Sequence, residues 1–272
     1  MGLAVETVVG SYAAANSTGA QAYTAGNGQS FQVRATNGTT VAWLEALWTK
    51  SLDAGYTRVR SPRLHDDDIG IEAQHYVGNA SPLLSEYFEQ ELYSQDSLIV
   101  EDFFTSAPTA TDVQQIGMQI YYDDLPGVAG NYMTWAQIQP MIKSYMGVYV
   151  SPISNATVGQ WGVGVALNSS QDVFKANSWY ALIGYETPTL FTAWSILGSD
   201  LGNLQVGGPG SVDPKITRMW FPYMESESGK PSIPVINSQN KQSTLVQVFH
   251  SAASTTLPIS LLFAYLGTTS GT

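Results

Sequence analysis

The feature that most constrains the fold of this chain is an internal repetition. The segment GYTRVRSPRLHDDDIGIEAQHY, residues 55–76, aligns without a gap with GNLQVGGPGSVDPKITRMWFPY, residues 202–223, at a separation of 147 positions (202 minus 55). The positions that are identical in the two segments are Gly55/Gly202, Val59/Val206, Pro62/Pro209, Asp66/Asp213, Ile69/Ile216 and Tyr76/Tyr223. A repeat of this length predicts two copies of one structural unit.

Segments on both sides of this repeat recur in the same order. Ser97–Phe104 (SLIVEDFF) matches Ser243–His250 (STLVQVFH) 146 positions later, and Ile116–Tyr122 matches Ile259–Tyr265 143 positions later. Nearer the N-terminus, residues 31–35 are aligned with 179–185 and residues 40–48 with 189–197. The separation drifts along the chain, as expected when insertions and deletions are confined to loops.

Residue periodicity predicts a chain rich in short strands. Alternating apolar residues predict strands at Gln29–Ala35, Tyr56–Arg60, Ile69–Val77, Leu98–Phe104, Ile116–Tyr122, Gly147–Ser151, Gly162–Leu167 and Trp179–Tyr185. Val41–Lys50 has its apolar residues at helical spacing and is predicted to form a short amphipathic helix. Thr134 and Gln137 have the spacing of a helix capping box.

We therefore expect an all-β fold of two tandem jelly-roll β-barrels, a double jelly roll, with short helical excursions. The expected barrels are residues 1–127 and 128–272. The best linker candidate is the sequence DDLPGVAGN at residues 123–131, which is acidic and then rich in proline and glycine. Each unit would carry roughly eight short strands.

The charge balance of the chain excludes some classes of function. Its 272 residues carry a net charge of −11 and contain no run of Lys or Arg, so phosphate-mediated nucleic-acid binding is disfavoured. Only 12% of the residues are charged, whereas 44% are hydrophobic. The charged fraction is about half that of ordinary soluble proteins, so a large uncharged surface must be buried between subunits or face a glycan or the cell exterior.

The sequence contains few residues able to carry chemistry. There is no cysteine, which excludes disulfides, thiolate metal sites and cysteine catalysis. The histidines are His65, His75 and His250, without the clustered pattern of a metal-binding cupin. No G-x-S-x-G elbow is present, and the Gly-rich stretch at residues 202–210 lacks the lysine of a phosphate loop. We therefore expect no catalytic residue and no cofactor.

The most polar cluster is His65–Asp68. The ligands of a calcium loop alternate along the chain, whereas the carboxylates here are consecutive and suit hydrogen bonds to the backbone of their own loop. We therefore expect a structural role and no metal site. A weak calcium site at Asp66–Asp68 is the alternative. Glu86, Glu89 and Glu91 are close in sequence, but an exposed loop or helix explains them better than a glycosidase pair.

No targeting segment is apparent in the sequence. Residues 1–10 lack the basic segment and apolar core of a signal peptide, and the longest apolar run, Leu257–Leu266, has the length of a strand. The last 30 residues, like the first 30, contain no Lys or Arg, so no basic arm that would condense nucleic acid is present at either end.

The paired G…V..P…D..I……Y skeletons and the paired SLIV and STLV strands give the chain a resemblance to one family. It resembles the double jelly-roll major capsid proteins of icosahedral double-stranded DNA viruses, the lineage of adenovirus hexon and the internal-membrane bacteriophages. The resemblance covers nearly the whole chain and rests on architecture, without a diagnostic short motif.

The resemblance implies a structural function and no enzymatic activity. Members of this family trimerise into pseudo-hexagonal capsomers that tile an icosahedral capsid, so the expected partners are a homotrimer, neighbouring capsomers and a separate vertex (penton) protein. A membrane or another protein would separate the shell from the genome, with no direct contact between this chain and nucleic acid. The expected location is the virion, after synthesis in the host cytoplasm.

Two rival functions remain open on the sequence alone. The first is a secreted or surface carbohydrate-binding protein with two β-sandwich modules, in which exposed Trp and Tyr residues would line a sugar site. The second is an enzyme of two tandem cupin barrels, which the small number of histidines disfavours. A stable trimer that needs no metal would separate the capsid reading from both rivals.

Overall fold

A computed structural model describes residues 2–37, 42–63, 70–75, 90–210 and 214–268. These residues form four antiparallel sheets, two from each half of the chain. The strands of the first half are β1 (Ala4–Ala13), β2 (Gln21–Ala22), β3 (Thr24–Ala25), β4 (Ala42–Lys50), β5 (Gly55–Arg60), β6 (Ile71–Gln74), β7 (Gln90–Leu92), β8 (Ile99–Phe104) and β9 (Val113–Tyr122).

The second half contains both strands and short helices. Its strands are β10 (Tyr132–Met133), β11 (Ser144–Val150), β12 (Val165–Ala166), β13 (Ser178–Glu186), β14 (Phe191–Leu197), β15 (Val206–Gly210), β16 (Ile233–Asn237), β17 (Leu245–Phe249) and β18 (Ile259–Thr268). Its helical segments are α1 (Trp135–Ile138), η1 (Gln139–Met141), α2 (Pro214–Thr217), α3 (Trp220–Ser228) and η2 (Ser238–Asn240). The predicted all-β class is confirmed in this form: two sandwich-like bodies with short helices.

The two bodies share one order of strands. In the first body the sheets run β3-β1-β9-β4-β7 and β2-β8-β5-β6. In the second body they run β10-β16-β13-β18-β11 and β12-β17-β14-β15. In reverse order, the second five-stranded sheet reads β11-β18-β13-β16-β10. Its first four strands correspond to β1, β9, β4 and β7 of the first body. The two four-stranded sheets correspond strand for strand in the order given. The repetition expected from the sequence is therefore present at the level of topology.

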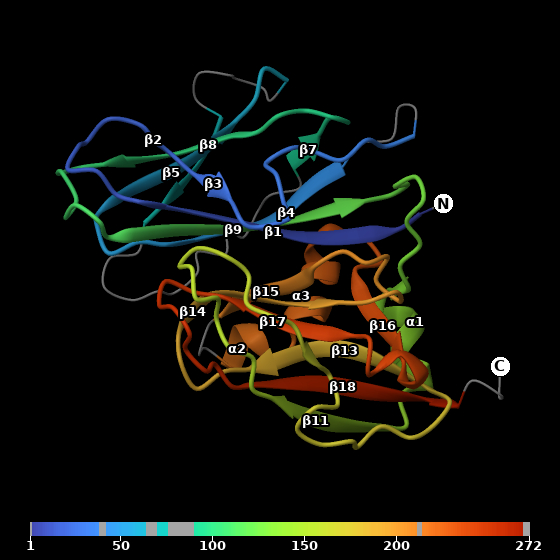
Figure 1. The fold of residues 1–272 in the computed structure, drawn as a ribbon. Helices are drawn as coiled ribbons and strands as arrows, with labels where there is room; N and C mark the ends of the chain where they lie inside the picture. The colour runs from blue at the N-terminus through green and yellow to red at the C-terminus, as the bar shows by residue number, and fades with distance from the viewer. Residues whose placement is uncertain (1, 38–41, 64–69, 76–89, 211–213, 269–272) are drawn as a thin grey trace.

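The four sheets are stacked as layers (Figure 1). The four-stranded sheet of the first body is outermost, and its five-stranded sheet lies beneath it. Hydrogen bonds then join β1 to β15, where Thr7 N donates to Gln205 O at 2.6 Å and Gly207 N donates to Thr7 Oγ1 at 2.9 Å. The second body's four-stranded sheet thus covers the first body's five-stranded sheet, and the sheet containing β13, β18 and β11 forms the other end.

Two hydrophobic clusters lie between these layers. One fills the first sandwich and includes Val8, Leu44 and Leu47. The other fills the second sandwich and extends across the junction to Val9 and Trp48 of the first body. The middle sheets are consequently buried on both faces, which removes the alternation of apolar and polar residues that marks a half-exposed strand.

This double burial explains why the predicted helix at Val41–Lys50 is wrong. Residues 42–50 form strand β4, in which Leu44 and Leu47 belong to one cluster and Trp48 to the other. The pairing of β4 with β9 shifts register between Leu44 and Ala46, as at a β-bulge. A bulge adds one residue to the strand, so Leu44 and Leu47 reach the same face at the spacing of a helix.

The residue-by-residue alignment of the repeat is also wrong in its middle. Val59 lies on β5, which is paired with β6 and β8, whereas Val206 begins β15, which occupies the place of β6 at the sheet edge. The structural counterpart of β5 is β14, and that of β4 is β13. The strand predicted at Gln29–Ala35, of which residues 31–35 were aligned with 179–185, is not formed: this segment contains only an isolated bridge between Gln32 and Ser97.

The alignment does hold in the last third of each body. β8 and β17 occupy equivalent places, as do β9 and β18, in agreement with the matches at separations of 146 and 143.

The predicted capping box is confirmed, because Gln137 N donates to Thr134 Oγ1 and Thr134 N donates to Gln137 Oε1. Residues 123–131 connect β9 to β10, and the domain boundary at 127/128 stays a prediction.

Candidate functional site

A buried polar cluster lies inside the first sandwich. Asp102 on β8 is fully buried, and one of its carboxylate oxygens accepts hydrogen bonds from Tyr12 Oη at 2.8 Å and Tyr23 Oη at 2.7 Å. Its other oxygen accepts from Thr57 Oγ1 and lies 3.1 Å from His75 Nε2. Burial, followed by the charge of Asp102, raises the pKa of both tyrosines, so they remain hydroxyl donors. The carboxylate is thereby satisfied within the sandwich.

This cluster contains a hydroxyl, a histidine and a carboxylate, but not in a catalytic geometry. In a nucleophilic triad the carboxylate and the hydroxyl contact different nitrogens of the imidazole. Here His75 Nε2 lies 3.0 Å from Thr57 Oγ1 and 3.1 Å from Asp102, so one nitrogen contacts both groups. The side chains of His75 and Asp102 are fully buried, out of reach of a substrate. The cluster therefore stabilises the sheet and does not form a reaction centre.

The junction between the two bodies is held by a buried tryptophan. Trp48 on β4 is 1% exposed, and its Nε1 donates to the carbonyl oxygen of Thr192 on β14 at 2.9 Å. Its ring packs edge-on against Trp220 of α3, with 6.2 Å between the ring centroids. A Cβ placed on Gly117 of β9 would lie 2.2 Å from Trp48 Cε2, so the glycine makes room for the indole.

Uncharged polar side chains complete this junction. Gln29 Nε2 donates to Gln205 Oε1 at 2.9 Å, and Gln205 Nε2 donates to Gln247 Oε1 at 3.3 Å. Trp161 Nε1 donates to Gln29 Oε1 at 3.1 Å. Directional bonds of this kind help to fix how the two sheets pack against each other.

Two basic groups are partly buried at one end of the junction. Burial lowers the pKa of Lys50 to about 8, and its Nζ donates to Ser251 Oγ at 2.9 Å. Burial and the neighbouring Lys50 lower the pKa of His250 to about 4. His250 is therefore neutral near pH 7, and protonating it would place a second positive charge beside Lys50.

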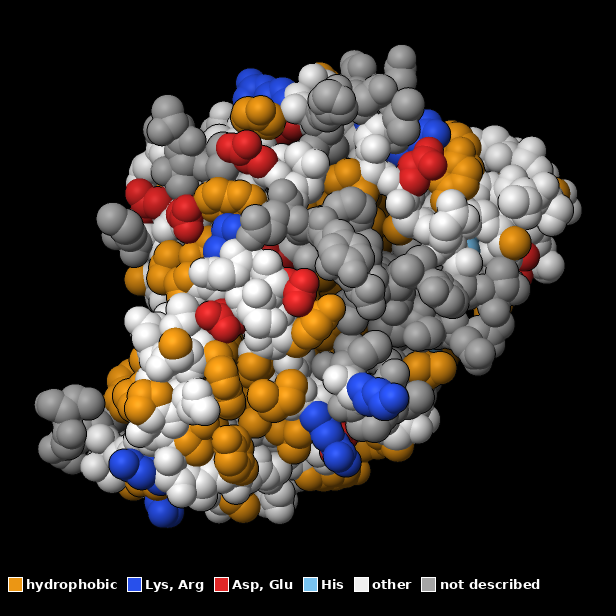
Figure 2. Space-filling view, turned by 180° about the vertical axis from the view of Figure 1, so that it is seen from behind, with side chains coloured by type: hydrophobic (Ala, Val, Ile, Leu, Met, Phe, Trp, Pro, Cys, Tyr) orange, Lys and Arg blue, Asp and Glu red, His pale blue; other side chains and the backbone are white. Residues whose placement is uncertain are grey.

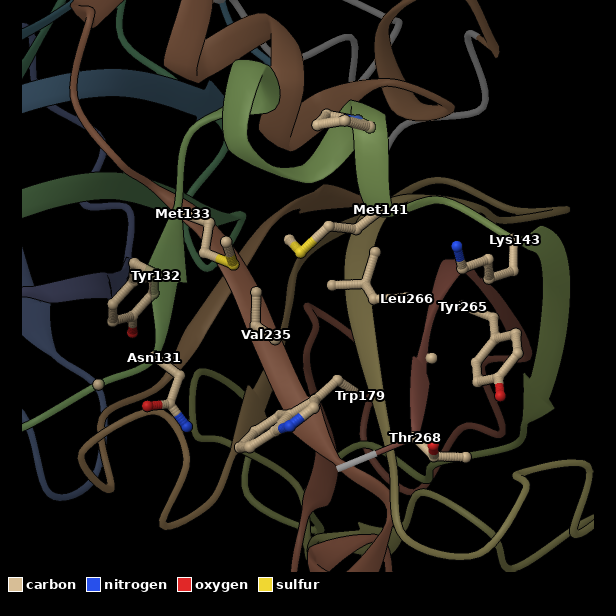
Figure 3. A pocket seen from close by; sticks show the side chains of 13 residues that line it. Asn131, Tyr132, Met133, Met141, Lys143, Trp179, Val235, Tyr265, Leu266 and Thr268 are labelled. Atoms are coloured by element: carbon tan, nitrogen blue, oxygen red, sulfur yellow. The ribbon is translucent and has the colours of Figure 1, made fainter. Parts of the chain in front are cut away.

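A groove lies on the outer face of the second body (Figure 3). It has a volume of about 810 Å³ and lies over β10, β16, β13 and β18. Met133, Met141, Trp179 and Leu266 line it, and Lys143 is the one charged residue among the described residues of its lining. A groove of this composition favours apolar contact over the binding of a charged ligand.

Exposed aromatic residues extend this face to the edge of the sheet. Tyr145 and Tyr149 on the edge strand β11 are 61% and 46% exposed, and both lie on the outer side of the strand. Figure 2 shows hydrophobic side chains gathered on the second body, with few charged side chains among them. An exposed apolar surface next to a hydrogen-bonding sheet edge is typical of an interaction site.

A second, smaller pocket of about 450 Å³ lies beside β1 in the first body. Its basic residue Arg34 donates two hydrogen bonds to Glu6, at 2.7 and 2.6 Å. The charge of the guanidinium is thus neutralised within the chain, so the described lining of the pocket offers no unpaired cation to an anionic ligand.

The structure places few of the polar residues considered from the sequence in a common site. His65–Asp68, Glu86 and Glu89 lie outside the described residues, and Glu91 lies on β7. Among the residues that are described, no group of three or more His, Asp or Glu side chains could hold a metal ion. The same residues include no helix long and apolar enough to cross a membrane.

The sequence reasoning missed both the Asp102 cluster and the groove. Asp102 could have been found, because alternation in IVEDFF places it on the same face as the apolar Val100 and Phe104. A carboxylate at an inward position requires buried partners. The groove gives no such local signal, since its residues come from strands and a helix spread from residue 130 to residue 268.

Comparison with models of known protein families, with curated proteins and with solved structures finds no match.

Proposed function

We propose that each body is a jelly-roll barrel and that the protein is a double jelly-roll major capsid protein. The observation that carries this proposal is the shared strand order. Both bodies pair a four-stranded sheet ordered β2-β8-β5-β6 or β12-β17-β14-β15 with a five-stranded sheet built around β1-β9-β4-β7 or its counterpart. Without the additional edge strand β3 or β10, each body has eight antiparallel strands, four in each sheet, which is the pattern of a jelly roll.

The proposed role is mechanical. A chain with two similar bodies can close around a three-fold axis as six similar units, which gives a capsomer with a nearly hexagonal outline. Such trimers would tile the shell of a virion, meet neighbouring capsomers at their sides and meet a different protein at the vertices. The net charge of −11 supports a shell that does not itself bind the genome, so a membrane or another protein would lie between them.

The surface of the second body supports an assembling protein. Its apolar groove and its exposed Tyr145 and Tyr149 would be unfavourable in water for an isolated chain, because large apolar patches promote association. The 12% charged fraction also leaves few charges to be desolvated in an interface. We therefore propose an obligate homotrimer.

Electron microscopy of the purified protein in a buffer containing EDTA tests the proposal. We expect particles of three chains, with six bodies around a three-fold axis. Particles that contain one chain, or rings built from another number of chains, would count against a capsid function.

One observation favours a second function, the binding of carbohydrate. Trp179 and Tyr265 line the groove together with the polar Asn131 and Thr268, which is a set of residues able to stack on and hydrogen-bond to a sugar. Titration with a panel of oligosaccharides, followed by tryptophan fluorescence, tests this alternative. Saturable binding by a monomeric protein would favour it over the capsid function.

A further inference from the structure

Among the described residues, the stacking of the two bodies leaves the outer faces of two sheets without another sheet packed on them. Within the chain, the second body's four-stranded sheet covers the first body's five-stranded sheet. The uncovered faces are therefore of opposite kinds: a four-stranded sheet at the end of the first body and a five-stranded sheet at the end of the second (Figure 1). Their strand orders are those of the pair that already packs together inside the chain.

Strand pairing shows which positions of the two five-stranded sheets correspond. Thr7 on β1 lies opposite Gln119 on β9, and Gly147 on β11 lies opposite Leu262 on β18. The matched segments of β9 and β18, 143 positions apart, place Leu262 at the position of Gln119. Gly147 therefore occupies the position of Thr7, a residue that bonds to the second body through both its backbone and its side chain.

Two positions on either side of these residues, buried valines are replaced by exposed tyrosines. Val5 and Val9 are 0% exposed and belong to the hydrophobic cluster that extends across the junction. Their counterparts on β11 are Tyr145 and Tyr149, which are 61% and 46% exposed. Two positions that are buried in the junction on the first five-stranded sheet therefore carry exposed aromatic residues on the second five-stranded sheet.

The four-stranded sheets show the same relation. Phe249 on β17 is fully buried at the junction: a Cβ placed on Gly26 would lie 3.3 Å from its ring and 3.0 Å from Val9 Cγ2. Phe249 and Val9 are therefore neighbours across the junction. The match of β8 with β17 places Phe103 at the position of Phe249, and Phe103 lies partly exposed on the outer face, stacked on Tyr56 at 5.1 Å.

We infer that the chain binds a second copy of itself by repeating its internal junction. The outer face of β10-β16-β13-β18-β11 in one copy receives the outer face of β2-β8-β5-β6 of the next, with Tyr149 and Phe103 in the places of Val9 and Phe249. This inference rests on the proposed capsid function and specifies the surfaces that join its subunits.

Charge favours this occupant over a nucleic acid or a lipid surface. On the incoming face, Arg58 is paired with Glu72 at 2.7 Å and Arg60 with Glu101 at 3.1 Å, so the face is neutral overall. The described lining of the receiving groove contains a single charged residue, Lys143. The incoming face is the smaller of the two, with four strands of which the longest, β5 and β8, have six residues. Strands about 4.8 Å apart and about 3.3 Å long per residue give this face roughly 400 Å². The contact would bury roughly 800 Å² from the two faces together, the size of a small interface, which repetition around a closed ring reinforces.

The symmetry of this contact predicts how the assembly closes. The two faces differ, so the contact is heterologous and builds either a ring or an open filament. When the internal junction and the contact between copies have similar geometry, six bodies alternate around one axis and the ring closes at three chains. A ring of three leaves neither face uncovered.

Cross-linking tests the inference directly, because the natural chain contains no cysteine. Gln74→Cys lies opposite Tyr56 on the incoming face, and Ser260→Cys lies opposite Tyr149 on the receiving face, so both substitutions keep the aromatic residues. Within one chain the two sites are separated by a stack of four sheets, beyond the reach of a short bis-maleimide. The control variant combines Gln74→Cys with a cysteine at Val163, an 81% exposed position outside both faces.

We expect the Gln74→Cys/Ser260→Cys variant to give covalent dimers and trimers, while each single variant and the control variant remain uncross-linked. Tyr149→Ala should weaken trimer association at least about 30-fold, the effect of truncating an aromatic residue that is buried in an interface. The matched substitution Tyr93→Ala, at a 39% exposed tyrosine away from both faces, should leave association unchanged.

The outcomes separate this inference from the proposed function. A trimer that cross-links equally well through the control pair, or that tolerates Tyr149→Ala, would overturn the inference and leave the capsid function standing. Cross-linking of a single variant would indicate a symmetric contact and would also overturn it. A protein that stays monomeric would contradict both.

Discussion

Replacing Trp48 tests whether the two bodies act as one folding unit. The indole is 1% exposed, donates to Thr192 O at 2.9 Å and packs edge-on against Trp220. Removing a buried tryptophan side chain costs about 3–5 kcal/mol, including the cavity that remains. Trp48→Phe keeps most of the packing but leaves the Thr192 carbonyl without its donor, which costs about 1–3 kcal/mol.

Urea unfolding at a fixed protein concentration, followed by circular dichroism, measures these effects. We expect a single transition for the natural chain and a loss of about 4 kcal/mol for Trp48→Ala, with the Phe variant intermediate. Leu52→Ala, at a 57% exposed residue just beyond β4, is the control and should change stability by less than about 0.5 kcal/mol. A Trp48→Ala variant as stable as this control would refute the view that the junction joins the bodies.

Three further predictions follow from buried groups. Asp102→Ala leaves several buried donors without an acceptor, so it should lower the free energy of unfolding by about 3 kcal/mol or more in thermal or urea unfolding. Asp102→Asn should lower the free energy of unfolding by less, and equal losses for the two variants would contradict the assigned hydrogen bonds. The folded-state pKa of His250, lowered to about 4, lies below its unfolded value of 6.5, so unfolding takes up a proton between these values. Stability should therefore fall as the pH drops from 6.5 to 4, and His250→Gln should flatten this dependence; an unchanged pH profile would show that His250 is not the titrating group. Gly117→Ala should destabilise by roughly 1–3 kcal/mol in the same urea assay, because its Cβ would overlap the indole of Trp48; a neutral effect would indicate free space there.

The strands with one face in a core and one face outward could be predicted from the sequence. In β5 the residues Thr57 and Val59 alternate with the outward Arg58 and Arg60, and the structure places the strand where periodicity predicts it. The prediction was wrong for β4, because a bulge and burial on both faces imitate the spacing of a helix.

The repeat shows what sequence identity can and cannot establish. It revealed two copies of one unit, but Val59 and Val206 belong to different strands of that unit. Short loops and glycine-rich turns differ in length between the two bodies, so an ungapped alignment across residues 55–76 crosses strand boundaries. The strand-for-strand match near the C-terminal end of each body survived because its residues pack in a core.

The sequence predicted that a large uncharged surface exists, but it did not predict where this candidate interaction surface lies. A charged fraction of 12% implied a large neutral surface, and such a surface exists on the second body. Its location depends on how β10, β13, β16 and β18 are ordered in a sheet, which no local pattern encodes. The exposed Tyr145 and Tyr149 become meaningful only when their buried counterparts on β1 are known.

Sedimentation equilibrium at micromolar concentration, without added metal, tests the central claim most directly. Our account predicts a single species of three times the 29.4 kDa chain mass, with folded monomer scarce even on dilution. A well-folded, soluble monomer of 29.4 kDa would contradict it and would favour the carbohydrate-binding alternative.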